Sequence, residues 1–133
     1  MGSNIEPESH LVAAAAALRR KFDMVCFSLV YRSAAVGMDG EDFLNACCKF
    51  ESGLSADQIR VCLKALEDAH GRDRSRGSWR PRTIDLDLLM FAGEVVDEEL
   101  YRYAHAYVPA SELVEIKLPE DLSETVTLVE LRL

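Results

Sequence analysis

Residues 83–91, TIDLDLLMF, alternate aliphatic side chains with two acidic ones, a pattern that predicts a buried strand. On a strand, Asp85 and Asp87 point to the same face, about 7 Å apart along the backbone, while the aliphatic side chains fill the opposite face. Neighbouring carboxylates repel each other and lose hydration, and a cation between them relieves both costs. Mg²⁺ suits the pair best, since it binds through one or two carboxylates plus substrate phosphates. A merely solvated acidic face is the alternative interpretation.

The segment before this strand, residues 72–82, supplies positive charge. It holds five arginines and one aspartate, a local charge of +4 that leaves −12 on the other 122 residues. Arginine binds phosphate through two parallel hydrogen bonds, so this segment can follow a polyphosphate, although a solvated loop or a nucleic-acid patch has the same composition. Together with the paired aspartates, it predicts metal-assisted phosphoryl transfer from a nucleotide. We expect the segment to be a lid that is mobile without ligand, with Trp79 covering the nucleotide.

The rest of the chain predicts helices and strands around this core. Apolar residues recur at helical spacing in residues 8–22 and 55–70, and Ser55 with Gln58 forms a capping-box sequence. Strands are predicted at residues 24–32, 43–50 and 125–133, and a helix within residues 104–114 despite a proline. This order predicts an α+β fold with an antiparallel sheet on one side and helices packed on the other.

Composition narrows the class of protein. A chain of 133 residues suits a single domain over residues 1–133, and its 49% hydrophobic and 29% charged residues are typical of a globular protein. The net charge of −8 disfavours general nucleic-acid binding. No apolar run reaches the roughly 18 residues that span a bilayer, and the start shows no signal-peptide pattern. We therefore expect a cytoplasmic, monomeric protein without membrane or nucleic-acid partners.

The central motif resembles a known family. Residues 71–74 (GRDR) and 79–89 (WRPRTIDLDLL) closely resemble the signature of 6-hydroxymethyl-7,8-dihydropterin pyrophosphokinases of folate biosynthesis. Three further blocks agree in order, namely residues 2–4 (GSN), 31–37 (YRSAAVG) and 42–46 (DFLNA). The resemblance implies a ferredoxin-like α+β fold and transfer of pyrophosphate from ATP to the pterin hydroxymethyl group, with release of AMP and two Mg²⁺ ions as cofactors.

The resemblance also implies roles for individual residues of this sequence. The metal-binding aspartates are Asp85 and Asp87, and with Arg72 and Arg82 at the phosphates they make up the expected catalytic group. The ATP site is implied to comprise Glu67, Arg72, Arg74, Trp79, Arg82, Leu88 and His105. The pterin site is implied to comprise Ser33 and Val36 through their backbone, Phe43 as a stacking ring and Asn45 as an amide that reads the ring edge. The strand pattern independently places Asn45 on the face opposite the apolar core.

The chain departs from the family in the region after the aspartates. The family usually has a Pro-His segment and a later arginine that touch phosphates, and this chain is shorter there. His105 and Arg102 are the substitutes to consider, but a histidine on a helix face is the alternative for His105. Ser75 stands where the family has a basic residue, with Arg76 adjacent.

The family also has a strand directly before the GSN block, where this chain has Met1. In a ferredoxin-like sheet that strand lies beside the one carrying Asp85 and Asp87. We expect either that the natural start lies upstream, which we favour, or that residues 125–133 fill the place.

Two other functions are considered: a shortened, catalytically impaired relative that binds nucleotide or pterin without turnover, and an RNA-binding module that uses the arginine segment.

Overall fold

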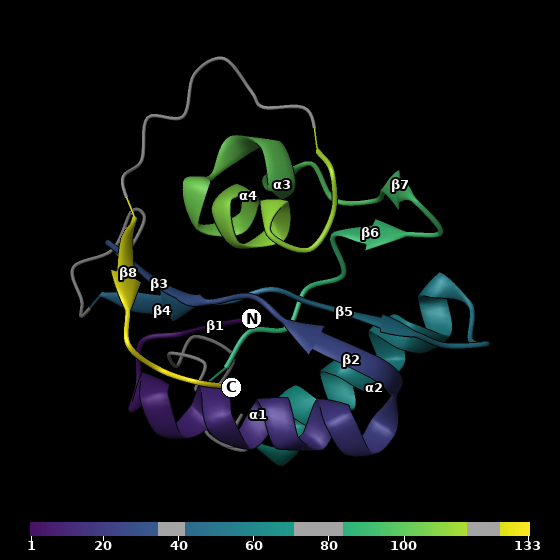
Figure 1. Cartoon of the computed structure of the whole chain (residues 1–133). Coiled ribbons are helices and arrows are strands. Elements are labelled where there is room, and N and C mark those ends of the chain that lie inside the picture. Colours follow the sequence, from purple (N-terminus) through teal and green to yellow (C-terminus); the bar gives the residue numbers. More distant parts are fainter. Residues whose placement is uncertain (35–41, 71–83, 117–125) are drawn as a thin grey trace, which may run out of the picture.

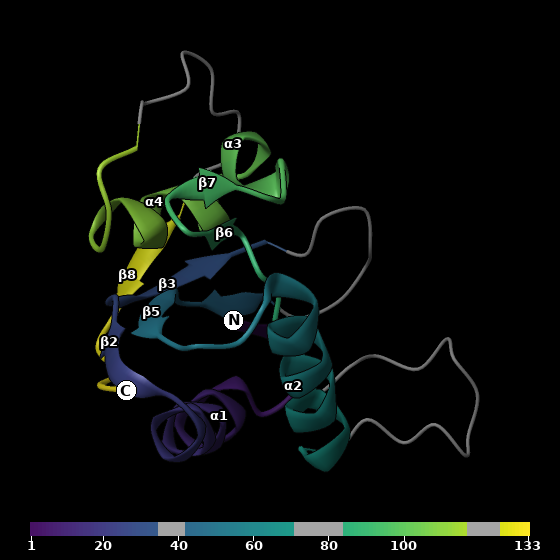
Figure 2. The same ribbon diagram turned by 90° about the vertical axis from the view of Figure 1, so that its right-hand side faces the viewer.

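The computed structural model describes residues 1–34, 42–70, 84–116 and 126–133, which form an α+β structure (Figure 1). Strands make a middle layer between two groups of helices (Figures 1 and 2). The longer helices, α1 (Pro7–Lys21) and α2 (Ala56–Ala69), lie on one side of this layer, and the short α3 (Glu99–Arg102) and α4 (Ala104–Ser111) lie on the other. No helix among the described residues is long and apolar enough to cross a membrane.

The prediction of an α+β fold is confirmed, but the expectation that helices pack on one side only is wrong. The sequence of α4 explains the difference, because Ala106, Tyr107 and Ala110 of this helix are all buried. A helix that is apolar around much of its circumference must be covered, and α4 contacts β3 and β4 of the sheet. The two longer helices and the helix within residues 104–114 are confirmed.

The strands form three antiparallel groups. The main sheet has the order β1-β4-β3-β8, made of Gly2–Ser3, Phe43–Asn45, Val30–Ser33 and Thr127–Val129 respectively. A separate ladder pairs β2 (Asp23–Phe27) with β5 (Cys48–Glu51). A small hairpin pairs β6 (Met90–Phe91) with β7 (Glu94–Val95).

Ser28 explains why the two long strands predicted at residues 24–32 and 43–50 are each broken in two. Its backbone N–H donates to the carbonyl of Cys47 at 2.9 Å. Its hydroxyl, and not its carbonyl, accepts the N–H of Cys47 at 2.8 Å and donates to the carbonyl of Leu29. This substitution of a side chain for a backbone acceptor interrupts both strands at the same level, so each continues in a different sheet.

The strand predicted at residues 83–91 is only partly formed. Asp85 makes an isolated antiparallel bridge with Gly2, and regular pairing resumes only at β6. The intervening residues 86–89 belong to no ladder among the described residues. The alternation itself is confirmed, since Ile84 and Leu86 are buried in the core while Asp87 is exposed.

The GSN block itself contributes a short strand, β1, which lies between β4 and Asp85. Gly2 pairs with Asn45 on one side and bridges to Asp85 on the other. The strand near the C-terminus, β8, is confirmed as a strand but pairs with β3 at the opposite edge of the sheet. Because β8 lies at the edge of the sheet away from β1 and Asp85, the expectation that residues 125–133 fill the first-strand position is wrong.

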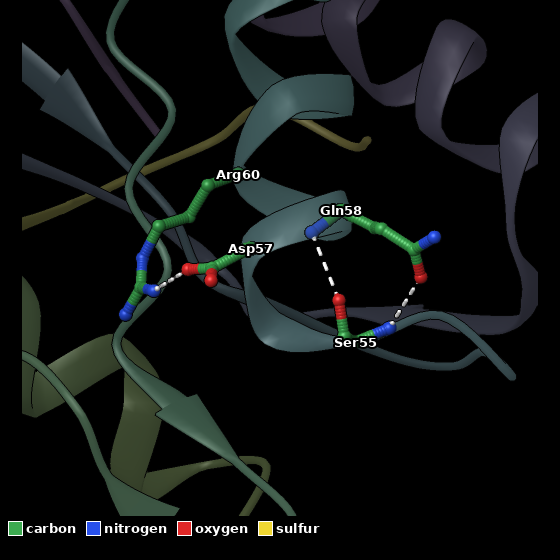
Figure 3. Close-up of polar contacts among 4 residues, drawn as sticks. All are labelled: Ser55, Asp57, Gln58 and Arg60. Carbon is green, nitrogen blue, oxygen red and sulfur yellow. Dashed lines mark hydrogen bonds and ion pairs between the residues drawn. The ribbon is translucent and has the colours of Figure 1, made fainter.

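The core lies between the sheet and the two longer helices. It is built mainly from aliphatic residues of these elements. Phe22 also belongs to it and stacks on Phe50, with a distance of 3.9 Å between the ring centroids. The fully buried aliphatic members are Leu11, Ala14, Leu18, Val30, Ala46 and Ile84. Helix α2 begins with the predicted capping box, in which Ser55 and Gln58 bond each other's backbone N–H groups (Figure 3). This cap fixes where α2 starts, and so sets the helix face that meets the site.

Candidate active site

Gly2 links the two groups of residues that the sequence assigns to the site. Its N–H donates to the carbonyl of Asp85 at 3.0 Å, and its carbonyl accepts the N–H of Asp85 at 2.8 Å. On its other side Gly2 lies opposite Asn45 of β4. Neighbouring strands lie about 4.8 Å apart, so the backbones of Asp85 and Asn45 are about 10 Å from each other. Only one strand, β1, therefore separates the acidic strand from the strand expected to bind pterin.

No residue with a Cβ atom fits at position 2 without displacing its neighbours. A Cβ atom on Gly2 would lie 3.2 Å from Oδ1 of Asn45 and 3.8 Å from a ring carbon of Phe43. Gly2 therefore leaves room for the amide and ring of the two residues expected to bind pterin.

Asn45 and Ser33 form a buried hydrogen-bonded pair. The amide nitrogen of Asn45 donates to the hydroxyl of Ser33 at 2.8 Å and to the carbonyl of Tyr31 at 3.2 Å. Both N–H groups of the amide are used in this way, which leaves Oδ1 as the atom able to accept a hydrogen bond from a ligand. Phe43 is half-buried and lies opposite Ser33 in the β3–β4 ladder, so three of the four expected pterin residues are adjacent.

Glu67 holds the acidic strand from α2. Its side chain is buried, and Oε1 accepts the backbone N–H of Leu86 at 2.8 Å. Leu86 stands between Asp85 and Asp87, so this bond fixes the backbone from which both carboxylates project. The sequence assigns Glu67 to the nucleotide site, and its strand-holding contact is a role that the sequence did not indicate.

Glu99 feels the charges of the acidic strand. The pKa of Glu99 is raised chiefly by burial and further by the negative charges of Asp97, Asp87 and Asp85, while His105 opposes the shift. The charges of His105 and of both aspartates therefore act on the Glu99 carboxyl group in opposite directions. His105 is half-buried and stacks on Tyr103 with a centroid distance of 5.0 Å.

A cavity of about 340 Å³ lies beside the acidic strand. It is lined by Glu67, Asp87 and Leu88, which the sequence assigns to the site, and also by Arg60, Lys64, Val96 and Asp97. Arg60 and Lys64 carry positive charge into it from α2, and Arg60 also bonds Asp57 at 3.0 Å (Figure 3). An apolar wall next to cations and carboxylates suits an aromatic base that carries charged groups.

Comparison with known proteins identifies the family. The family model described as 7,8-dihydro-6-hydroxymethylpterin-pyrophosphokinase (HPPK) matches residues 1–118. The chain belongs to the HPPK family.

Individual HPPK relatives agree with this match. A protein of Haemophilus influenzae named 2-amino-4-hydroxy-6-hydroxymethyldihydropteridine pyrophosphokinase is 33% identical over 130 residues, which cover 95% of this chain and 81% of that protein. Proteins of the same name from Methylorubrum extorquens and Aquifex aeolicus are 34% and 30% identical over 125 and 110 residues. These alignments cover 90% and 81% of this chain, and 78% and 68% of the two relatives.

Several residues expected in an HPPK site lie outside the described residues. They are Val36 of the pterin group and Arg72, Arg74, Trp79 and Arg82 of the phosphate group. The predicted lid over residues 72–82 falls in the same part of the chain. The structure therefore brings together Ser33, Phe43 and Asn45 on one side of β1, and Asp85, Asp87, Glu67 and Leu88 on the other.

Sequence reasoning missed Arg60, Lys64 and Glu99. The first two share a helix face with Glu67, at spacings of four and three residues along α2, and this polar stripe could have been found from the sequence. Glu99 gave no such signal, because the charges that act on it come from residues on the other side of the β6–β7 hairpin.

Paired aspartates also fit the metal expected for an HPPK. Among the described residues no three acidic, histidine or cysteine side chains are grouped as a complete metal site. Two carboxylates on one face, with room beside them for phosphate oxygens, match the way Mg²⁺ is usually held with nucleotides.

Proposed function

We propose that this chain transfers pyrophosphate from MgATP to 6-hydroxymethyl-7,8-dihydropterin and releases AMP, as a step of folate biosynthesis. One observation carries the proposal: Gly2 pairs with Asn45 on one side and with Asp85 on the other. This pairing sets a candidate pterin site and a candidate metal–nucleotide site side by side, as a transfer between two bound substrates requires.

In this proposal the pterin lies against β4. Oδ1 of Asn45 accepts a hydrogen bond from a ring N–H, since both N–H groups of the amide are held by Ser33 and Tyr31. Phe43 provides a ring face for stacking, and the backbone of Ser33 lines the pocket. The resemblance assigns Val36 to the same pocket. These contacts orient the hydroxymethyl group towards Asp85 across the width of β1.

ATP lies on the other side of β1, in the 340 Å³ cavity. Leu88 contacts the base, and Glu67 holds the strand beneath the nucleotide. Arg72, Arg74, Trp79, Arg82 and His105 are assigned to the phosphates and to the covering of the nucleotide. Arginines and a histidine near the phosphates stabilise the charge that develops during transfer.

Asp85 and Asp87 hold two Mg²⁺ ions in this proposal. When bound, the metal neutralises phosphate charge and lowers the pKa of the attacking hydroxyl group. Two contacts hold the backbone that carries the aspartates, one between Gly2 and Asp85 and one between Glu67 and the N–H of Leu86. Positioning of the two substrates then supplies most of the rate enhancement.

We also propose that the sheet is ferredoxin-like. The support is the sequence of helix α1, antiparallel strands, helix α2 and the acidic strand, with β1 between β4 and Asp85.

A coupled assay of AMP release tests the function. AMP should appear from MgATP only when 6-hydroxymethyl-7,8-dihydropterin is present, and Asp85→Ala should abolish it. Asp23→Asn, an exposed aspartate on β2, serves as the matched control and should keep wild-type turnover. Binding of both ligands without any AMP would contradict turnover and would support a role in ligand binding alone.

A further inference from the structure

Asn45 is nearly buried on a face of the sheet that points away from the main core. Leu44 and Ala46, its neighbours along the chain, belong to the core cluster, so the side chain of Asn45 points to the opposite face. Helix α4 lies on that face and contacts both β3 and β4 (Figure 1). Since Asn45 is only 5% exposed, α4 forms part of the cover over the candidate pterin site.

Two contacts of α4 fall on residues that adjoin Asn45. Tyr31 is paired with Asn45 across the β3–β4 ladder, and its hydroxyl group donates to Oε2 of Glu112, the C-cap of α4, at 2.7 Å. Cys47 follows Asn45 by two residues, so it points to the same face, and its Sγ donates to the carbonyl of Ala106 at 3.6 Å. Helix α4 therefore meets the sheet on two sides of Asn45, once across the ladder and once along the strand.

The buried face of α4 consists largely of small side chains. Apart from Tyr107 and Pro109, its buried residues are the alanines at positions 104, 106 and 110. Protein interiors are held in one arrangement by side chains that interdigitate, and a single methyl group projects too little to do so. The alanine face therefore permits α4 to tilt on the sheet unless hydrogen bonds hold its ends.

The carboxylate of Glu112 holds the C-terminal end of α4. Oε1 accepts the backbone N–H of Leu29 at 3.2 Å, and Oε2 accepts the hydroxyl group of Tyr31. Hydrogen bonds to an ionised acceptor are about twice as strong as those between neutral groups. The strand that carries Tyr31 is itself fixed, because β3 pairs with β4 on one side and with β8 on the other. Glu112 therefore ties a helix that can tilt to a strand that is held at both edges.

We propose that Glu112 is a positioning residue for pterin binding, because it holds α4 over Asn45 through the hydroxyl group of Tyr31. The inference rests on the proposed function, in which Asn45 binds the pterin. Without the Glu112 carboxylate, the C-terminal end of α4 moves away from Tyr31, and water reaches Asn45 from that side. The other end of α4 keeps its contact with Cys47, so His105, about 10 Å away along the helix, stays in place.

Calorimetric titration of the full 133-residue chain with 6-hydroxymethyl-7,8-dihydropterin, at saturating Mg²⁺ and non-hydrolysable ATP analogue, tests the inference. Glu112→Ala should raise the Kd of the pterin about fivefold, and Glu112→Gln, which keeps an acceptor oxygen, should restore most of the affinity. In both variants the Kd of the ATP analogue, titrated separately, should change by less than about twofold. Glu115→Ala removes another exposed carboxylate just beyond α4 and, as the matched control, should bind both ligands as the wild type does.

Two further measurements distinguish positioning from a general loss of stability. Tyr31→Phe removes only the hydroxyl group and should raise the pterin Kd about threefold in the wild-type chain, but no further in Glu112→Ala, because the two groups form one contact. In the ligand-free chain, the side-chain amide protons of Asn45 should exchange with water about threefold faster in Glu112→Ala, as measured by nuclear magnetic resonance. The amide protons of Asn4 serve as the reference and should exchange at the wild-type rate.

Three results would overturn the inference: an unchanged pterin Kd in Glu112→Ala, equal losses of pterin and ATP-analogue affinity, or additive effects of Tyr31→Phe and Glu112→Ala. The wild-type chain separates this inference from the proposed transfer. Pterin binding without AMP release would contradict the transfer, while the variants would still decide the role of Glu112. A wild-type chain that binds no pterin would overturn both.

Discussion

Replacing Glu67 by leucine removes the side chain that fixes the acidic strand. Glu67 is 5% exposed, and its Oε1 accepts the N–H of Leu86 at 2.8 Å. A hydrogen bond to a charged acceptor contributes about 1.5–3 kcal/mol, and a buried N–H left without an acceptor costs about 1–3 kcal/mol. Leucine avoids the cost of burying a carboxylate, and this gain offsets part of the lost stability. We expect the free energy of unfolding to fall by about 2 kcal/mol.

The kcat/KM of this variant should fall by more than its loss of unfolding free energy alone would cause. The N–H of Leu86 lies between Asp85 and Asp87, so a shift of this backbone moves both carboxylates, and misplacement by about 1 Å can cost about 100-fold in rate. Glu67→Gln keeps an oxygen acceptor and should recover most of the stability. Urea denaturation gives the unfolding free energy, and AMP release gives kcat/KM. The reasoning is refuted if Glu67→Leu unfolds at the wild-type urea concentration, or if Glu67→Gln and Glu67→Leu lose stability equally.

Three further predictions concern individual side chains. Asp85→Ala and Asp87→Ala should each abolish AMP release while leaving the urea midpoint equal to or slightly above wild type, because carboxylate repulsion is removed; wild-type turnover in both variants would disprove their role as metal ligands. Asn45→Ala should weaken pterin binding by about 2 kcal/mol, roughly 30-fold in Kd, and leave ATP affinity nearly unchanged in calorimetric titrations; equal losses for both ligands would make the residue structural. Burial, and then the hydrogen bond of its hydroxyl to Glu112 at 2.7 Å, raise the pKa of Tyr31 from 10.0 to about 12. The folded state therefore favours the protonated phenol, a contribution that is complete below pH 10 and is lost as the pH rises towards about 12. Glu112→Gln should lower this pKa in an ultraviolet titration of the phenol, with Tyr31→Phe as the reference, and an unchanged titration would contradict the assigned partner.

Local sequence patterns predicted those elements whose cause is local. The capping box at Ser55, the apolar spacing of α1 and the alternation around Asp85 all appear in the structure as expected. Each depends only on residues within one or two helical turns or along one strand, so the local sequence is enough to predict it.

Features that depend on distant partners were not predictable in the same way. The break shared by two strands arises because one hydroxyl, that of Ser28, replaces a backbone acceptor across a ladder. The placement of α4 on the second face of the sheet depends on the path of the chain after β6. The charges of Asp85 and Asp87 raise the pKa of Glu99, and no local pattern in the sequence indicates this effect. In the site, the sequence supplied the residues of both halves, but only the structure shows that Gly2 joins them.

The nature of the transferred group is the most direct test of the central claim. Phosphorus nuclear magnetic resonance of a complete reaction with MgATP and 6-hydroxymethyl-7,8-dihydropterin should show AMP and a pterin that carries two linked phosphorus atoms. Neither product should form with Asp85→Ala. Formation of ADP with a pterin carrying a single phosphate would contradict pyrophosphate transfer, and an unchanged ATP spectrum with the pterin present would contradict catalysis by this chain.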